Sequence, residues 1–284
     1  MLVRSQLRHV MLVLSLSVAS IFFQSTKVAA EQPAFLGFDR NDYPGDDRVA
    51  ELHKTFAYAG YWLNNPPGAK TNTWIGKRTQ LQATGFGFLV LFNGRLYAEL
   101  KTVARAAKLG QSDAQAAIAA ARREGFPDAT IIFLDQEQGG RMLPEQKAYL
   151  FAWVDGVIRS GFRAGVYCSG IAAKEEGGIR VITAEDIRQS AGSRTISYWV
   201  TNDGCPPAPG CVMPQRPPSP TESGIAFAEV WQFAQSPKRK DVAAACTGYS
   251  SDGNCYAPRA DARQHLHVDL NTATSADPSH GRTR

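Results

Sequence analysis

Ile131-Ile132-Phe133-Leu134-Asp135-Gln136-Glu137 is the stretch of sequence from which the fold of this chain is best deduced. A short run of β-branched and aromatic residues, followed here by Gln138-Gly139-Gly140, is typical of a buried strand. Side chains two positions apart on a strand share a face, so we expect Asp135 and Glu137 to emerge side by side. Glycosidases use paired carboxylates of this kind. The alternative is an ordinary solvated strand end followed by a loop.

Residues 1–30 have the pattern of a secretory signal peptide. A basic start precedes an apolar run over residues 10–23, and Val28-Ala29-Ala30 is a small-residue cleavage site. We expect cleavage near Ala30, a mature chain that begins near Glu31, and secretion to the periplasm or the medium. An uncleaved anchor is the alternative, but the run is shorter than the ~20 residues that a membrane span needs. No stable membrane anchor is therefore expected.

The remainder of the 284-residue chain has the size of one α/β barrel domain. The leader holds three basic residues and no acidic one, so its removal lowers the formal net charge from +5 to +2. Apart from the isolated run Lys238-Arg239-Lys240, basic residues are not clustered, and nucleic acid is not expected as a partner. The cysteine and histidine spacings do not match a zinc site. We predict no metal ion, no cofactor and a monomeric protein.

All five cysteines follow the leader, where export permits disulfides. Cys205 and Cys211 flank a proline-rich loop, and Cys246 and Cys255 flank a polar one. We predict that neighbours pair, 205 with 211 and 246 with 255, although sequence alone does not fix the connectivity. Cys168 lies within an apolar strand, where a buried, inert thiol is expected.

Apolar runs and helical patterns alternate along the chain and predict an α/β, TIM-type (β/α) barrel over residues 31–272. The pattern becomes irregular in the last third, where two disulfide-stapled loops are expected at residues 204–224 and 236–264. Residues 273–284 are polar and are predicted to be a disordered tail. The eight predicted strands cover residues 35–38, 57–63, 85–92, 131–137, 163–168, 195–200, 226–233 and 265–270. Helices are predicted at residues 46–56, 74–83, 112–124, 144–160 and 183–190.

Acids, amides and aromatic rings follow the predicted strands, which is where barrel enzymes carry their working residues. Such a mouth suits a sugar, whose ring faces stack on aromatic side chains and whose hydroxyls pair with carboxylates and amides. No glycine-rich phosphate loop is present. The candidates for substrate binding are Tyr61, Trp62, Tyr167, Trp199, Asn202, Trp231 and Gln232.

Several short motifs, taken in order, resemble those of glycoside hydrolase family 25 muramidases. They are Gly37-Phe38-Asp39, Asp135-Gln136-Glu137, Val230-Trp231-Gln232-Phe233 and His267-Val268-Asp269-Leu270-Asn271. With Gly60-Tyr61-Trp62 and Tyr198-Trp199 included, the chain is more similar to a secreted bacterial glycoside hydrolase-like group, domain-of-unknown-function family 1906. The resemblance covers most of residues 34–272.

The resemblance implies an α/β barrel that acts on peptidoglycan glycan, since family 25 enzymes cleave the β-1,4 bond after N-acetylmuramic acid. Carried over, Glu137 is the general acid of a retaining, muramidase-type reaction. Asp135 assists, either by orienting the N-acetyl group of the substrate or by raising the pKa of Glu137. Asp39 and Asp269 line the subsite where positive charge develops.

Two other functions stay open at this point. The sequence after Trp199 differs from that expected of an active muramidase, and the two loops that contain cysteines are additions to the family pattern. A non-catalytic glycan-binding protein on the same scaffold is therefore the main alternative. A deacetylase or amidase is a further one, but such enzymes usually need a metal ion or a Ser or Cys nucleophile with a His partner.

Overall fold

The computed structural model describes residues 33–203, 216–235 and 268–283. The predicted signal peptide and the four cysteines expected to form disulfides lie outside these residues. Within the described residues, no helix combines the length and the apolar character needed to cross a bilayer.

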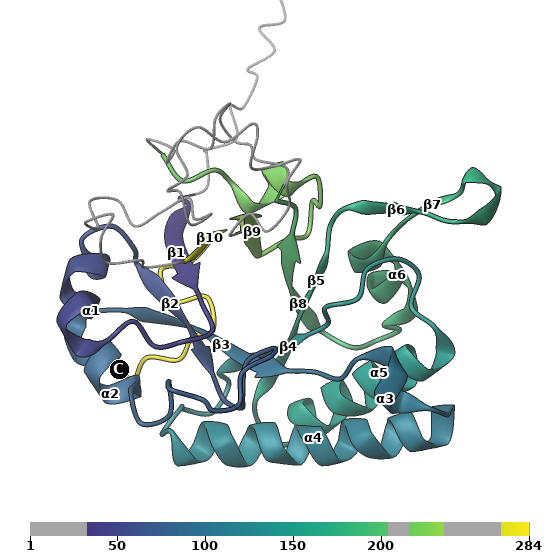
Figure 1. Ribbon diagram of the computed structural model, residues 1–284, viewed down its shortest axis with the longest axis horizontal. Helices are drawn as coiled ribbons and strands as arrows, with labels where there is room; N and C mark the ends of the chain where they lie inside the picture. The colour runs from purple at the N-terminus through teal and green to yellow at the C-terminus, as the bar shows by residue number, and fades with distance from the viewer. Residues whose placement is uncertain (1–32, 204–215, 236–267, 284) are drawn as a thin grey trace, which may run out of the picture. The chain divides into compact units, whose positions relative to one another are not determined.

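Eight strands close into a barrel in the order β1-β10-β9-β8-β5-β4-β3-β2 (Figure 1). This confirms the predicted α/β barrel in its main architecture. The strands are β1 (Phe35–Asp39), β2 (Tyr58–Trp62), β3 (Gly87–Asn93), β4 (Ile131–Asp135), β5 (Arg163–Ser169), β8 (Ile196–Thr201), β9 (Val230–Ala234) and β10 (Asp269–Ala273).

One strand departs from the expected all-parallel order. β10 pairs antiparallel with both β1 and β9, whereas the other neighbouring strands pair in parallel. Asp39, the last residue of β1, therefore lies opposite Asp269, the first residue of β10. In such barrels the active site lies where the parallel strands end. Because β10 runs in the opposite direction, its first residue, Asp269, lies at this end of the barrel.

The apolar run that identified β4 is buried throughout, as expected for a strand covered on both faces. Phe133 points toward β5, where Gly165 leaves room for its ring. A Cβ atom at Gly165 would lie 2.4 Å from that ring. Phe133 also packs edge-to-face against Trp199 of β8 inside the barrel. Large side chains in the barrel interior are thus accommodated by small residues on neighbouring strands.

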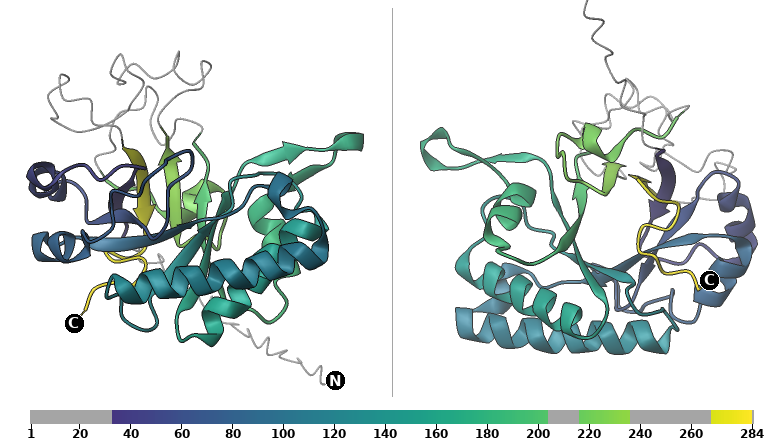
Figure 2. Two further views of the ribbon diagram at one scale, coloured as in Figure 1. Left: turned by 60° about the horizontal axis from the view of Figure 1, so that its bottom comes forward. Right: turned by 180° about the vertical axis from the view of Figure 1, so that it is seen from behind.

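Six α-helices accompany the described strands, and the two longest pack against each other along one side of the barrel (Figure 2). Their close approach depends on small residues, because a Cβ atom at Gly110 would lie 2.3 Å from Tyr149 O and one at Gly156 would lie 2.7 Å from Ala114 Cβ. The helices are α1 (Asp46–His53), α2 (Arg78–Thr84), α3 (Tyr97–Leu100), α4 (Val103–Arg123), α5 (Pro144–Arg159) and α6 (Thr183–Ser190).

The predictions for α5 and α6 are confirmed, but that for α4 began too late. The expected start at Ser112 is wrong, since the helix begins at Val103 and Thr102 caps it by accepting a hydrogen bond from Arg105 N. The helix continues through Gly110 because that position faces α5 at very short range. A local capping pattern at Ser112 could not reveal this tertiary contact.

The predicted disorder of residues 273–284 is wrong for residues 273–283. Ser279 is fully buried, its Oγ accepts a hydrogen bond from Val90 N, and its carbonyl oxygen accepts one from Ile131 N. Asp277 Oδ1 accepts from Phe88 N. The segment is polar because it supplies hydrogen-bonding partners to the beginnings of β3 and β4, which would otherwise be buried without them.

A short hairpin of β6 (Ala172–Lys174) and β7 (Arg180–Ile182) leaves the barrel after β5 and projects from it (Figures 1 and 2). Arg141 donates to Glu175 at 3.1 Å and ties the hairpin to the loop that follows Glu137. The hairpin and this loop therefore stand on the same side of the barrel mouth.

Candidate active site

Three carboxyl side chains interact at the end of the barrel where the parallel strands finish. Asp39 ends β1, Asp135 ends β4, and Glu137 follows two residues later. The charge of Glu137 raises the pKa of both aspartates, and the charge of Asp39 raises that of Asp135. The structure thus brings together the three acids that the sequence selected from distant positions.

Two amide side chains hold the Asp39 carboxyl group. Gln232 Nε2 and Asn271 Nδ2 donate hydrogen bonds to the same oxygen, Asp39 Oδ1, at 2.9 and 2.7 Å. Gly60 provides space beside this group, because a Cβ atom there would lie 2.6 Å from Asp39 Cβ. The Asp39 carboxyl group is therefore confined sterically on one side and oriented by two donors.

Each amide is in turn oriented by an aromatic donor. Trp199 Nε1 donates to Asn271 Oδ1 at 2.9 Å, and Tyr167 OH donates to Gln232 Oε1 at 2.8 Å. With its oxygen occupied in this way, each amide must present its NH₂ group to Asp39. Two buried relays, one through a tryptophan and one through a tyrosine, thus converge on one carboxylate oxygen.

Burial raises the pKa of Asp39 from 3.8 to about 6. The hydrogen bonds from Asn271 and Gln232 oppose this rise because they stabilise the carboxylate, and the negative charge of Glu137 adds to it. Asp39 is therefore mostly ionised at neutral pH and protonated in mild acid.

Asp135 and Glu137 form a coupled pair with one buried and one accessible member. Asp135 is 5% exposed, and burial together with the charge and hydrogen bond of Glu137 raises its pKa far above the ordinary range. Glu137 is exposed, and partial desolvation raises its pKa, whereas its hydrogen bond with Asp135 lowers it. Two acids in this arrangement retain a shared proton more readily than isolated carboxyls do.

This corrects one expectation about the pair. One of the two roles considered for Asp135 was to raise the pKa of Glu137 through its negative charge. Instead, desolvation raises the pKa of Glu137, and the hydrogen bond from Asp135 acts in the opposite direction. The physical reason is that Asp135 is the more deeply buried member, so that burial raises its pKa and favours its protonated, uncharged form.

Tyr167 and Trp199 lie in the barrel interior next to this cluster. Their ring centroids are 4.3 Å apart, and the side chains are 7% and 2% exposed. Burial and the nearby acids raise the pKa of Tyr167, so its hydroxyl stays protonated as a donor. Both rings pack inside the barrel beside the carboxyl cluster, and they do not form an exposed aromatic surface on which a sugar could stack.

Tyr61 does not lie near the carboxyl cluster. Gly60 faces Asp39, and Tyr61, the next residue on the strand, therefore faces the opposite side of the sheet. The Tyr61 hydroxyl donates to Oε2 of Glu124, the C-cap residue directly after α4, at 2.5 Å, and its ring packs against Phe126 and Trp74. The residue thus anchors the helical layer outside the barrel, although it was expected in the aromatic wall.

Trp62 is only 3% exposed, and its Nε1 donates to Arg40 O at 3.1 Å. Trp74 donates to the same carbonyl oxygen at 3.2 Å. The two tryptophans therefore fix the loop that follows Asp39. Trp62 lies near the mouth, but it supports the loop and offers little surface to a ligand.

Trp231 and Asn202 also serve as braces. Trp231 is the strand neighbour of the inward-facing Gln232, and its Nε1 donates to Asn202 O at 3.1 Å. The Asn202 side chain donates to Ser223 O at 3.0 Å. These contacts connect the ends of β8 and β9 to the short 3₁₀-helix η2 (Pro220–Ser223) and keep both side chains away from the carboxyl cluster.

Asp269 is placed at the mouth beside Asp39 by the pairing of β1 with β10, and it is partly exposed. Its charge acts on Arg40, in the loop that follows Asp39. Asn271, two residues further on, is the member of this strand that contacts Asp39.

Asn271 and Gln235 are the residues that sequence reasoning did not select for the site. Gln235 Nε2 donates to Gln232 Oε1, Tyr167 OH and Thr201 Oγ1 at 2.6, 3.0 and 3.3 Å. Asn271 had two sequence signals, its place in the motif at residues 267–271 and its alternation with Asp269, whereas Gln235 has none beyond following a strand. Among the described residues, no three His, Cys, Asp or Glu side chains are grouped as a metal site requires.

A closed α/β barrel with interacting carboxyl groups at its mouth defines a glycoside hydrolase-like barrel. Residues 61–205 match the family described as Rv2525c-like, glycoside hydrolase-like domain. The match spans just over half of the chain, and the protein belongs to this family. No curated protein sequence matches the chain.

Solved structures are similar to this chain at low sequence identity. An uncharacterized protein from B. stearothermophilus is 19% identical, with a TM-score of 0.51 over 84% of this chain and 95% of that one. The Mycobacterium tuberculosis Tat-secreted protein Rv2525c in complex with L-tartrate is 15% identical, with a TM-score of 0.47 over 85% and 95%. A family 25 glycosyl hydrolase from Bacillus anthracis is 12% identical, with a TM-score of 0.47 over 84% and 88%.

Proposed function

We propose that this protein is a secreted glycoside hydrolase that cleaves β-1,4 glycosidic bonds of bacterial cell-wall glycan, with Glu137 as the general acid. The observation that carries the proposal is the placement of Asp135 at the end of β4 and of Glu137 two residues later, where Asp135 is buried and Glu137 is exposed at the barrel mouth. A carboxyl group that is both accessible and shifted toward its protonated form is what protonation of a leaving oxygen requires.

In this mechanism Glu137 donates the shared proton to the glycosidic oxygen as the bond to the anomeric carbon breaks. Asp135 keeps the proton within the pair before the reaction, since its own pKa is raised by burial. Positive charge that develops on the sugar is stabilised by the carboxylate of Asp39, which the relays of Asn271 and Gln232 hold in place. Asp269 adds negative charge at the same edge. Water then completes the hydrolysis, and its second proton returns to the pair.

Two further observations support the proposed location and substrate: the leader pattern and the family match. The leader pattern of residues 1–30 supports export to the periplasm or the medium, where peptidoglycan is accessible. The matched family carries the description glycoside hydrolase-like domain, which supports a carbohydrate substrate. The protein is proposed to act as a monomer and without a cofactor.

The test is incubation of the purified mature chain with purified peptidoglycan while new reducing ends are measured. Glu137→Gln keeps the shape of the side chain but removes its acid and should abolish release. Glu185→Gln, at an exposed position on α6, is the matched control and should cleave like the wild type. Equal release by wild type and Glu137→Gln would refute the role of Glu137.

A second candidate function is glycan binding without cleavage. It is favoured by the hydrogen bonds of Asp39, whose Oδ1 is already engaged by two amides, and by the burial of Asp135. In such a protein the carboxyls would only accept hydrogen bonds from sugar hydroxyls. Sedimentation of both wild type and Glu137→Gln with insoluble peptidoglycan, with no reducing ends from either, would establish this alternative.

A further inference from the structure

Three large apolar residues are exposed on the two segments that follow β3 and β4, near the segment that carries Glu137. Leu96, Tyr97 and Leu143 are 51%, 41% and 41% exposed. We propose that these three residues, here called the rim platform, stack against a sugar ring of the glycan next to the bond that is cut. The proposal rests on the proposed function and extends it by assigning a further glycan subsite.

The position of the rim platform follows from backbone contacts with the strand that carries the acids. Gly94 N donates to Asp135 O at 3.2 Å, and Tyr97 N donates to Gln138 Oε1 at 2.6 Å. A Cβ atom at Gly94 would lie 2.5 Å from Asp135 O, so the two segments touch. Residues 94–97 therefore run alongside residues 135–138, and Tyr97 is bonded to the residue directly after Glu137.

Leu143 reaches the same rim through a chain of amide contacts. Gln138 Oε1, which accepts from Tyr97 N, also accepts from Gln146 Nε2 at 3.4 Å. Gln146 Oε1 in turn accepts from Leu143 N at 2.9 Å. The segment after β3 and the segment after β4 are thus linked through Gln138, and each contains an exposed apolar residue close to this link.

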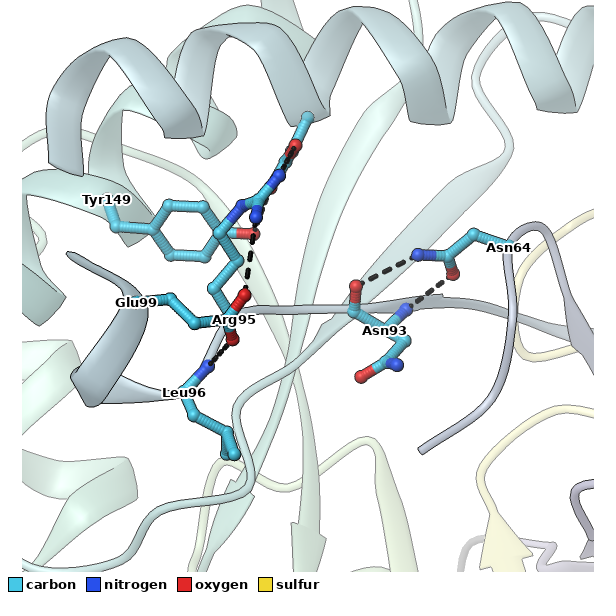
Figure 3. Close-up of polar contacts among 7 residues, drawn as sticks. Asn64, Asn93, Arg95, Leu96, Glu99 and Tyr149 are labelled. Carbon is cyan, nitrogen blue, oxygen red and sulfur yellow. Dashed lines mark hydrogen bonds and ion pairs between the residues drawn. The ribbon is translucent and has the colours of Figure 1, made fainter. Parts of the chain in front are cut away.

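A partly buried ionic network orients the segment that carries Leu96 and Tyr97 (Figure 3). Arg95 Nε and Nη2 donate to the two oxygens of Asp113 at 2.6 and 2.9 Å, and Tyr149 OH donates to Asp113 at 2.9 Å. Glu99 accepts from Leu96 N at 2.9 Å and from Arg95 at 3.3 Å. A bidentate arginine–carboxylate pair fixes orientation as well as distance.

The other end of the same loop is fixed at the end of β3. Asn64 Nδ2 donates to Asn93 O at 3.0 Å, and Asn93 N donates to Asn64 Oδ1 at 2.7 Å (Figure 3). The segment that exposes Leu96 and Tyr97 is therefore pinned on both sides. Ordering it before a ligand arrives lowers the entropic cost of binding.

The chemistry of the rim platform fits a sugar ring. The C–H face of a pyranose is apolar and slightly positive, and the face of an aromatic ring is negative, so the two attract when stacked. Arg95, the basic residue within residues 94–97, is already paired with Asp113 and Glu99, so this segment does not offer its charge to an acidic peptide. A glycan strand whose glycosidic oxygen reaches Glu137 continues past this flanking segment, and this continuity favours glycan as the occupant.

The experiment measures binding of peptidoglycan glycan strands, freed of stem peptides and sorted by length, in a Glu137→Gln background that prevents cleavage. Tyr97→Ala should weaken the Kd for long strands about tenfold, which corresponds to about 1.4 kcal/mol. Tyr97→Phe keeps the ring and should keep the affinity. Ile158→Ala, at a 40% exposed apolar position on α5, is the matched control and should bind like the parent.

The outcomes separate this proposal from the proposed function. Unchanged affinity of Tyr97→Ala for long strands would refute the rim platform, while release of reducing ends by the wild-type chain would still support the hydrolase. If the loss in Tyr97→Ala appears only when stem peptides are present, the platform binds peptide and sugar stacking is wrong. If the wild-type chain releases no reducing ends and the Glu137→Gln parent binds no glycan strand of any length, both proposals are overturned.

Discussion

Asp39→Asn should make the protein more stable at neutral pH, because the wild-type carboxylate is ionised there at a buried position. The pKa of Asp39 is raised from 3.8 to about 6. A carboxyl with a raised folded-state pKa stabilises the fold below its unfolded pKa, and this contribution is lost as the pH rises toward the folded pKa. Asparagine has nearly the same shape and its carbonyl can still accept from Gln232 and Asn271, but it does not titrate.

The size of the effect follows from the two pKa values. The interval between 3.8 and about 6, at 1.36 kcal/mol for each pKa unit, corresponds to about 3 kcal/mol. The stability advantage of Asp39→Asn should therefore grow by about 3 kcal/mol between pH 4 and pH 7 and remain constant above that.

The measurement is urea unfolding of the wild type and Asp39→Asn across this pH range, analysed as the difference between their unfolding free energies. Asp277→Asn is a useful control, because this residue lies at the opposite end of the barrel, where it accepts from Phe88 N. A difference between wild type and Asp39→Asn that does not change with pH would refute the raised pKa. The assigned ionisation of the site would then be wrong.

Three further predictions concern positions around the site. Gly60→Ala should lower the unfolding free energy by about 1–3 kcal/mol and reduce cleavage, because its Cβ would crowd Asp39; urea unfolding and reducing-end release check this. Tyr61→Phe should lower the unfolding free energy by about 1–2 kcal/mol, because the hydrogen bond to Glu124 is lost, and should leave glycan affinity unchanged. Weaker glycan binding at unchanged stability would show instead that Tyr61 contacts the glycan. The buried Cys168 thiol, whose pKa is raised by burial, should react with a thiol reagent only after unfolding; rapid labelling of the native protein would contradict its placement.

Local sequence patterns located most of the barrel strands and the acids at the end of β4, but they did not reveal the β6–β7 hairpin, and they placed the last strand at residues 265–270 where the structure has β10 at Asp269–Ala273. The run at residues 131–135 is apolar because β4 is buried on both faces, and the spacing of Asp135 and Glu137 placed them together at its end. The positions of α5 and α6 were also predictable, since their boundaries depend on nearby residues such as Pro144 and Thr183.

The same patterns could not assign a face to every aromatic side chain. Tyr61 and Trp62 are both buried, because β2 is covered by the barrel interior on one side and by helices on the other. The alternation that distinguishes the faces of a half-exposed strand is absent from such a strand. Tyr61 was therefore expected at the mouth, whereas its hydroxyl contacts Glu124, directly after α4.

The direction of β10 and the order of the C-terminal segment were likewise decided by distant contacts. The polarity of residues 273–283 suggested disorder, but Ser279 and Asp277 bond to the backbone of β3. A hydrophobic run has no information about whether its strand will pair in a parallel or an antiparallel sense. Only the closed barrel shows that Asp269 begins its strand beside Asp39.

The sequence by itself determined that the chain would form an α/β barrel with Asp39, Asp135 and Glu137 at strand ends, because hydrophobic period and strand alternation are local properties. The tertiary structure decided how these acids ionise and what holds them. Gln232 and Asn271 lie 193 and 232 positions from Asp39 in the sequence, yet both donate to its carboxylate. Burial and hydrogen bonding set a pKa, and both arise only when distant strands close into one barrel.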